Sequence, residues 1–275
     1  MENKNILEEI AQSDMILVGI GEEFDSAGKL RTSREYIKGC ESLKEAGLHW
    51  LIAAWNEFCA EKAGDCSVRE SMEKLRRMLA DKNYYMVSLS AGSEIMRCFG
   101  DGGEKGTGEA VFSGARLVMP CGSVLKKQCV RGCGEVLHDV TEEDRERMRT
   151  VFEKLYRGEP AKETDVLTGV CPECGSVLIL NNVYAEKYNE KGYLDQWQRY
   201  MKWLQGTLNR KLFILELGVG MRFPTVIRWP FEKAAFYNKK AYFCRVNEKL
   251  YQLTEELAEK GCGISQNAID WLLKL

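Results

Sequence analysis

Four short apolar runs punctuate the chain and are separated by longer stretches with helical spacing. Each run is rich in β-branched or aromatic residues and ends at glycine or polar residues, which is typical of a fully buried parallel strand. The runs are MILVGIG from residue 15, YYMVSLS from 84, KLFILELGVG from 211 and AYFCRVN from 241. We therefore expect them to be the strands of a buried parallel sheet.

Amphipathic helices are predicted between these runs. The segment 33–64 repeats apolar or aromatic residues three and four positions apart, which is the spacing of one helix face. The segment 67–83 begins with Ser67 and Glu70, spaced as in a capping box. Because strands alternate with helices, the pattern predicts an α/β fold with a parallel sheet.

Residues 118–204 break this alternation. They contain two pairs of cysteines, a charged helix that Thr141 caps and Gly158 ends, and an aromatic helix that begins near residue 194. The α/β pattern resumes after this segment. We therefore predict a discontinuous α/β domain, residues 1–117 and 205–275, with a small metal-binding domain, residues 118–204, inserted in it.

The two cysteine pairs have the spacing of a structural zinc site. Cys129 and Cys133 are separated by three residues, Cys171 and Cys174 by two, and 37 residues lie between the pairs. Four thiolates in a tetrahedron suit Zn²⁺ and leave no open position for catalysis. Ordinary buried thiols are the alternative for the first pair, because free cysteine is often buried. We favour structural zinc, whose loss should unfold the inserted domain.

Charge and composition exclude some classes of partner. The 275 residues carry a net charge of −2 and the pI is near 6.0, so the chain has no overall basic footprint for nucleic acid. The first apolar run is too short to span a bilayer and lacks a cleavage site. Eleven cysteines without an export signal favour the reducing cytoplasm. We expect a cytoplasmic protein with neither nucleic acid nor membrane as its partner.

A Gly-x-Gly turn follows two of the predicted strands. Gly19-x-Gly21 comes directly after the first strand, where backbone N–H groups could meet the pyrophosphate of a dinucleotide. A tight strand-to-helix turn is the alternative at this position. Gly218-x-Gly220 follows the third strand, and Arg222 and Arg228 beyond it could meet phosphate or lie in solvent.

This combination resembles the sirtuins, and more narrowly the bacterial class M sirtuins, which are associated with modification of lipoyl carriers. The resemblance rests on Cys129 and Cys133 with CPECG, on LELGVG with PFE beyond it, and on Asn247 after the fourth strand. It implies a Rossmann-like NAD-binding domain, a structural zinc module and a substrate cleft between them. It also implies that NAD is cleaved at its nicotinamide bond. ADP-ribose would pass to the acyl oxygen of an acylated or lipoylated protein, or to a protein side chain.

The resemblance assigns site residues as well. Ser90 falls where the family has the asparagine of its ribose motif, and Gly92 where it has the aspartate. Cys121 stands in place of the histidine of a His-Gly dipeptide, so Cys121 and Ser90 are the catalytic candidates. A thiol with an ordinary pKa of ~8.5 is mostly neutral and a poor base. The residues expected to bind NAD are Gly19, Gly21, Gly218, Gly220 and Asn247.

Two hypotheses about function remain. The first is an NAD-dependent protein deacylase or ADP-ribosyltransferase. The second is a catalytically inactive sirtuin-fold module that senses NAD or ADP-ribose or acts as a protein scaffold. Glu22 and Glu23 follow the first glycine turn, and their carboxylates would repel a pyrophosphate unless they point away. A nucleic-acid-binding zinc ribbon is disfavoured, because the helix beside the cysteines is acidic and the whole chain is nearly neutral.

Overall fold

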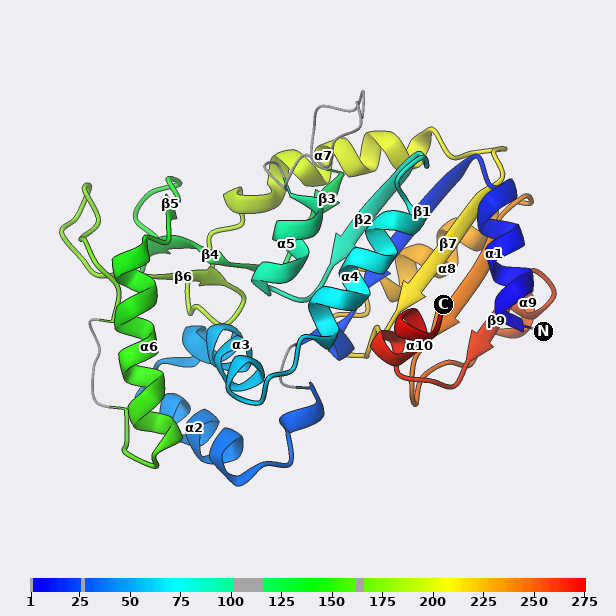
Figure 1. The fold of residues 1–275 in the computed structure, drawn as a ribbon. Helices are drawn as coiled ribbons and strands as arrows, with labels where there is room; N and C mark the ends of the chain where they lie inside the picture. Colours follow the sequence, from blue (N-terminus) through cyan, green and yellow to red (C-terminus); the bar gives the residue numbers. More distant parts are fainter. Residues whose placement is uncertain (1, 26–27, 101–115, 162–165) are drawn as a thin grey trace.

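The computed structural model describes residues 2–25, 28–100, 116–161 and 166–275. Across these residues the chain forms a parallel sheet of six strands in the order β3-β2-β1-β7-β8-β9 (Figure 1). The strands are β1 (Met15–Ile20), β2 (Tyr84–Ser88), β3 (Leu117–Val118), β7 (Leu212–Leu217), β8 (Tyr242–Val246) and β9 (Gly261–Ile264). The predicted α/β fold is confirmed.

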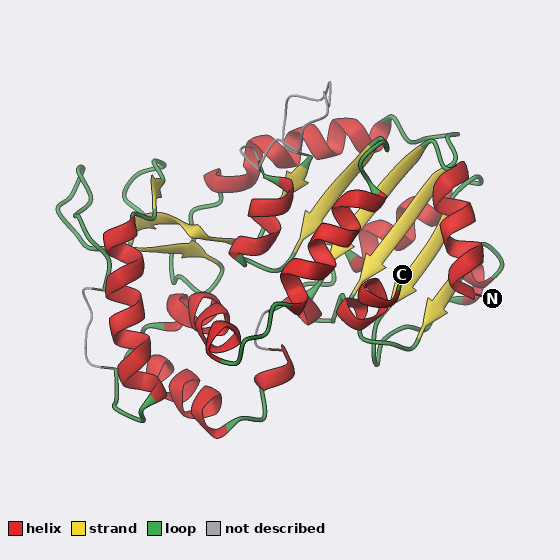
Figure 2. Cartoon of the chain, in the orientation of Figure 1, coloured by secondary structure: helices red, strands yellow, loops and turns green. Residues whose placement is uncertain are grey.

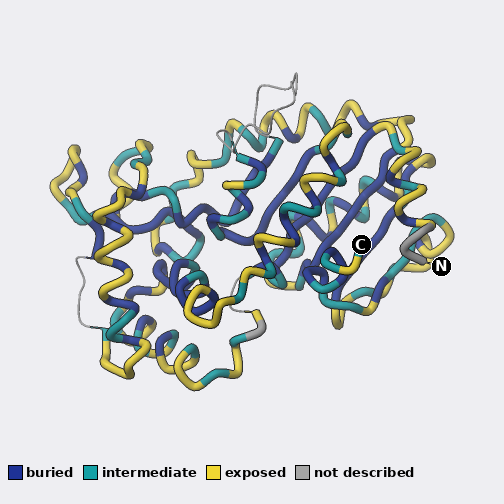
Figure 3. Tube along the Cα trace, viewed as in Figure 1, coloured by how far each residue is buried: buried dark blue, intermediate teal, exposed yellow. Residues whose placement is uncertain are grey.

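The four apolar runs form the four inner strands of this sheet. Strands β1 and β7 are buried along their whole length, and β2 and β8 are buried at all but their first residue (Figure 3). Alternate residues of β1 face opposite sides of the sheet, as the pleat requires. The edge strands were not predicted, because β3 has only two residues and β9 has the sequence GCGI, which lacks an apolar run.

Helices cover both faces of the sheet (Figures 1 and 2). One face packs against α1 (Glu2–Gln12), α4 (Ser67–Met78), α5 (Ser93–Phe99) and α10 (Ala268–Lys274). The other packs against α7 (Lys191–Gln205), α8 (Arg228–Tyr237) and α9 (Glu255–Ala258). Within the described residues no helix is both long and apolar enough to cross a membrane.

A smaller module lies beside the edge of the sheet at β3 (Figure 1). Its sheet has the order β5-β4-β6 and is antiparallel. Helix α6 packs on it together with α2 and α3, and the Trp55 and Phe152 rings meet at a centroid distance of 5.5 Å. The elements are β4 (Gly122–Cys129), β5 (His138–Asp139), β6 (Leu178–Asn182), α2 (Arg34–Glu45), α3 (Ile52–Lys62) and α6 (Glu142–Tyr156).

This packing bears on where the domains divide. The predicted boundary places residues 33–62 in the larger domain, yet α2 and α3 share one apolar cluster with β4, β6 and α6. It also places α7 in the small domain, yet Tyr200 of α7 is buried in the cluster beneath the parallel sheet. We propose that the small module combines residues 33–62 with residues 118–190.

Two details of the predicted helices differ in the structure. The segment 33–64 is not one helix, because Gly47 takes a positive φ of 72° and separates α2 from α3. The capping box at Ser67 is also wrong: α4 begins at Ser67 itself, so Cys66 is the N-cap, and the Ser67 hydroxyl has no partner among the described residues. Thr141, by contrast, caps α6 in a capping box with Asp144.

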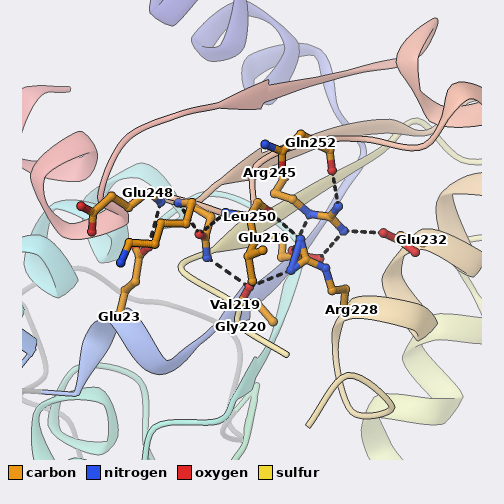
Figure 4. Close-up of polar contacts among 12 residues, drawn as sticks. Glu23, Glu216, Val219, Gly220, Arg228, Glu232, Arg245, Glu248, Leu250 and Gln252 are labelled. Atoms are coloured by element: carbon orange, nitrogen blue, oxygen red, sulfur yellow. Dashed lines mark hydrogen bonds and ion pairs between the residues drawn. The ribbon is translucent and has the colours of Figure 1, made fainter. Parts of the chain in front are cut away.

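A buried ion pair joins the neighbouring strands β7 and β8. Glu216 of β7 and Arg245 of β8 are register neighbours, and the Arg245 guanidinium donates to both carboxylate oxygens at 2.6 and 3.2 Å. Arg245 also donates to Glu232 of α8 at 2.6 Å and to the Gln252 carbonyl at 2.7 Å (Figure 4). Both side chains are at most 2% exposed, so each charge depends on the other for solvation.

Breaking this pair should destabilise the whole sheet. Glu216→Gln leaves the Arg245 charge buried and only partly compensated, so we expect the free energy of unfolding to fall by about 3–5 kcal/mol. The measurement is urea unfolding followed by circular dichroism. Glu73→Gln is the control, because Glu73 pairs with Arg77 at the surface and exposed pairs contribute less than about 1 kcal/mol. Equal loss in both variants would contradict this assignment.

Candidate functional site

The strand order of the parallel sheet reverses between β1 and β7. From β1 the chain proceeds outward through β2 to β3, and from β7 it proceeds in the other direction through β8 to β9. Ligands of open parallel sheets bind in the crevice beyond the carboxyl ends of the strands at such a switch point. Both predicted Gly-x-Gly turns lie at these two strand ends, so the fold brings them together.

The two turns touch. A Cβ added to Gly21 would lie 2.2 Å from the carbonyl oxygen of Gly218, and Gly218 has a φ of +62°. A Cβ on Gly220 would lie 3.1 Å from a carboxylate oxygen of Glu22. Gly19 has a different neighbour, since its Cβ would lie 2.7 Å from Ile227 at the start of α8. Gly21 thus packs against Gly218 and Gly220 faces Glu22 at the switch point, whereas Gly19 permits close packing of helix on strand.

Asn247 and Arg228 hold the second turn in place. The Asn247 amide donates to the Val219 carbonyl at 3.1 Å, and its own carbonyl accepts from the backbone N–H groups that come after it. Arg228 donates to the same Val219 carbonyl at 3.1 Å and to the Leu250 carbonyl (Figure 4). Asn247 therefore caps the end of β8 in this structure. Its role toward NAD stays a prediction.

The two arginines beyond the second turn both have partners within the chain. Arg228 is 7% exposed and is committed to backbone carbonyls. Arg222 is exposed, yet it donates to the Tyr184 hydroxyl, and its guanidinium carbon lies 4.6 Å from the centre of that ring. Both guanidinium groups are therefore already engaged within the chain, at the place where an anionic ligand would enter.

The two glutamates after the first turn point in different directions. The Glu23 side chain packs against Gly218, and its carboxylate accepts from the backbone N–H of Glu248 at 2.9 Å and of Ala268 at 2.7 Å. It thereby joins the first turn to the start of α10. Glu22 points across the crevice and accepts from the N–H of Gly220 at 2.6 Å. Only Glu22 therefore stands where an anionic ligand would meet the second turn.

The structure brings Ser90 and Cys121 close to an acid that sequence reasoning missed. Asp25 pairs with Arg31 at 3.4 Å, and burial raises the pKa of this carboxyl to about 6, with Arg31 opposing the shift. Cys121 is 4% exposed. Burial, followed by the negative charge of Glu22, raises the pKa of the Cys121 thiol to about 12. At neutral pH this thiol is protonated and cannot act as a base, whereas Asp25 can.

A second carboxylate reaches the same strand end from the small module. Glu57 of α3 accepts hydrogen bonds from the backbone N–H and the hydroxyl of Ser93, 36 residues later in the chain. A Cβ on Gly92 would lie 3.3 Å from one of its oxygens. Burial raises the pKa of Glu57. The Glu57 carboxylate thus lies beside Gly92, a contact between distant segments that a linear motif cannot reveal.

The four predicted zinc ligands converge at one end of the small module. Their sulfur atoms all lie within 4.8 Å of one another. The Cys133 sulfur is 3.2 Å from that of Cys174, 3.4 Å from that of Cys171 and 3.5 Å from that of Cys129. Tetrahedral zinc with Zn–S bonds of ~2.3 Å needs sulfurs about 3.8 Å apart, so a small outward movement accommodates the ion. The residues fit Zn²⁺.

The turn that presents the second pair has the geometry of a zinc knuckle. The N–H of Gly175 donates to the Cys171 carbonyl at 2.8 Å, and Gly175 takes a φ of +70° that suits glycine. Cys121 lies instead in the cluster beneath the parallel sheet with residues of β1, β2 and β7. The metal set and the catalytic candidate are separate.

Zinc content should distinguish these cysteines. We expect Cys129→Ser to lose the metal and to melt at a lower temperature, because among the described residues the cysteine end of the small module has only Leu178 in its apolar cluster besides the cysteines and depends on the ion. Cys121→Ser should keep one zinc per chain. Atomic absorption on the purified proteins measures this. Equal metal content in both variants would show that the cluster is not a zinc site.

The fold and the site together define the class. A switch-point crevice in a parallel sheet, beside an antiparallel module with four clustered cysteines, is the architecture of the sirtuins, and this chain has the sirtuin fold. No family model matches the sequence. The sequence is 20% identical over 277 residues to a protein ADP-ribosyltransferase of Staphylococcus aureus, covering 94% of this chain and 82% of that protein.

Solved structures show the same likeness. Sir2Tm bound to a propionylated peptide superimposes with a TM-score of 0.55 and 13% identity, over 100% of this chain and 97% of that one. A Sir2 mutant with a p53 peptide and NAD gives a TM-score of 0.54 and 14% identity, with the same coverage. At these identities the likeness is one of fold. The Rossmann-like sheet and the inserted cysteine module predicted from the sequence are confirmed.

Proposed function

We propose that the protein binds NAD in the crevice between β1 and β7 and transfers ADP-ribose to a protein acceptor. The observation that carries this is the meeting of the two glycine turns, at Gly21 and Gly218, at the switch point of a sirtuin fold. The ADP-ribosyltransferase relative and the sirtuin structures that hold NAD or acylated peptides support it. The acceptor would be a side chain or an acyl group of an acylated or lipoylated protein.

Different residues of the chain would have different roles in this reaction. The N–H of Gly220 would bind the pyrophosphate, because those of Gly21 and Gly218 already donate to the carbonyls of Leu217 and Val246. The four cysteines would hold a structural zinc ion. When bound, NAD supplies the ADP-ribosyl group, whose bond to nicotinamide breaks as the bond to the acceptor forms. Asp25 would take the proton that the acceptor loses. Cys121 would contribute shape rather than a charge.

The alternative is a binding module that holds NAD or ADP-ribose without turnover. The protonated Cys121 thiol and the contact between Glu22 and Gly220 favour it, because both weaken the site as an enzyme. Binding of ADP-ribose without release of nicotinamide from NAD would support this alternative over transfer.

The location also belongs to this proposal. The chain has eleven cysteines, and cysteines in this number suit a reducing compartment. A cytoplasmic site of action fits them.

Nicotinamide release from NAD tests the proposed reaction. With a panel of acylated and lipoylated proteins as acceptors, Asp25→Asn should lower kcat/KM by about 100-fold or more, the usual contribution of a positioned base. Cys121→Ser should retain activity. Asp81→Asn, at an exposed position, is the matched control. Release that is unaffected by Asp25→Asn would remove Asp25 from the mechanism.

The pH profile gives a second readout of the same residue. A base must be deprotonated to accept a proton, and burial raises the pKa of Asp25 to about 6. The kcat/KM of the unmodified chain should therefore rise between about pH 5 and pH 7. Asp25→Asn should flatten this rise, while a purely structural role would leave its shape unchanged.

A further inference from the structure

Glu22 makes an unusual contact across the crevice. Its side chain leaves the first glycine turn and accepts a hydrogen bond at 2.6 Å from the N–H of Gly220, which is 198 residues later in the chain. Gly220 lies at the carboxyl end of β7, beside the switch point of the sheet. An internal anion therefore takes the backbone donor that the second turn presents.

The rest of the Glu22 carboxylate is poorly accommodated. Its other oxygen, Oε1, is buried and has no hydrogen-bond partner among the described residues. Its charge acts on Asp25 and Cys121, which offer it no positive charge. Arg228 is nearby, but its guanidinium is engaged by the Val219 and Leu250 carbonyls. A buried carboxylate oxygen without a partner is costly, so this position is not explained by stability.

Glu23 provides the contrast within the same turn. Both of its oxygens are satisfied, one by the N–H of Glu248 and the other by the N–H of Ala268. That carboxylate joins three segments of the chain and has an evident structural role. Glu22 joins only two turns, and it does so at the point where a larger anion would enter.

We propose that Glu22 is a built-in competitor for phosphate at the Gly220 N–H. The inference rests on the proposed binding of NAD in this crevice. A nucleotide places its pyrophosphate there only when the Glu22 side chain leaves, because two anions cannot share one N–H at close range. Glu22 thus sets the affinity for phosphorylated nucleotides and leaves neutral nucleosides unaffected.

Calorimetry with three probes tests this. The probes are ADP-ribose, inorganic pyrophosphate and adenosine, and the proteins are the unmodified chain, Glu22→Gln and Glu22→Ala. We expect both variants to bind ADP-ribose and pyrophosphate about tenfold more tightly, the worth of one charge-assisted hydrogen bond. Adenosine should bind equally to all three. Glu22→Ala removes the carboxylate without introducing a new buried amide, so the test still works if Glu22→Gln folds poorly.

Glu23→Gln is the matched control. It should lower the melting temperature, since two backbone N–H groups lose a charged acceptor, without tightening the binding of ADP-ribose. If ADP-ribose binds the unmodified chain and both Glu22 variants with equal affinity, or binds the variants more weakly, the competitor role is overturned while NAD binding stands. If neither ADP-ribose nor pyrophosphate binds any of these proteins, the proposed function is overturned and the competitor role with it.

Discussion

The close crossing of two glycine turns at the centre of the parallel sheet is the constraint on which the site depends. A side chain on Gly21 would collide with the Gly218 carbonyl, at 2.2 Å from its Cβ. The crossing fixes the distance between the ends of β1 and β7 and so the floor of the crevice. Glu23, Asn247 and Arg228 all brace this crossing from outside through backbone groups. These hydrogen bonds hold the main chain of the two turns in one arrangement.

Acids, rather than bases, surround this crevice. Glu22, Asp25 and Glu57 approach it from two modules, while Arg31 pairs with Asp25 at 3.4 Å and the other nearby arginines are engaged by a tyrosine hydroxyl or by carbonyl groups. A site of this kind holds little free positive charge for an anionic ligand, so backbone N–H groups must supply most of the attraction. This balance explains how one fold could serve either as a transferase or as a binding module.

Much of the fold could be predicted from the sequence, because local patterns encode it. Apolar runs predicted the inner strands, and cysteine spacing identified the four sulfurs that cluster. Long-range contacts could not be predicted. The direction of Glu22 depends on Gly220, and the approach of Glu57 to Gly92 depends on the contact of α3 with the start of α5, so no short segment of sequence determines either one. Asp25 was missed because a single acid in a turn carries no periodic signal.

A crystal structure of the protein with ADP-ribose would show directly whether the crevice binds the nucleotide. We expect electron density for the pyrophosphate in the crevice between β1 and β7, with a phosphate oxygen within hydrogen-bonding distance of the Gly220 N–H and the Glu22 side chain turned away from it. The contact between Glu23 and Ala268 should be unchanged. Density for the ligand elsewhere on the chain, with Glu22 still bonded to Gly220, would contradict both the proposed site and the competitor role of Glu22.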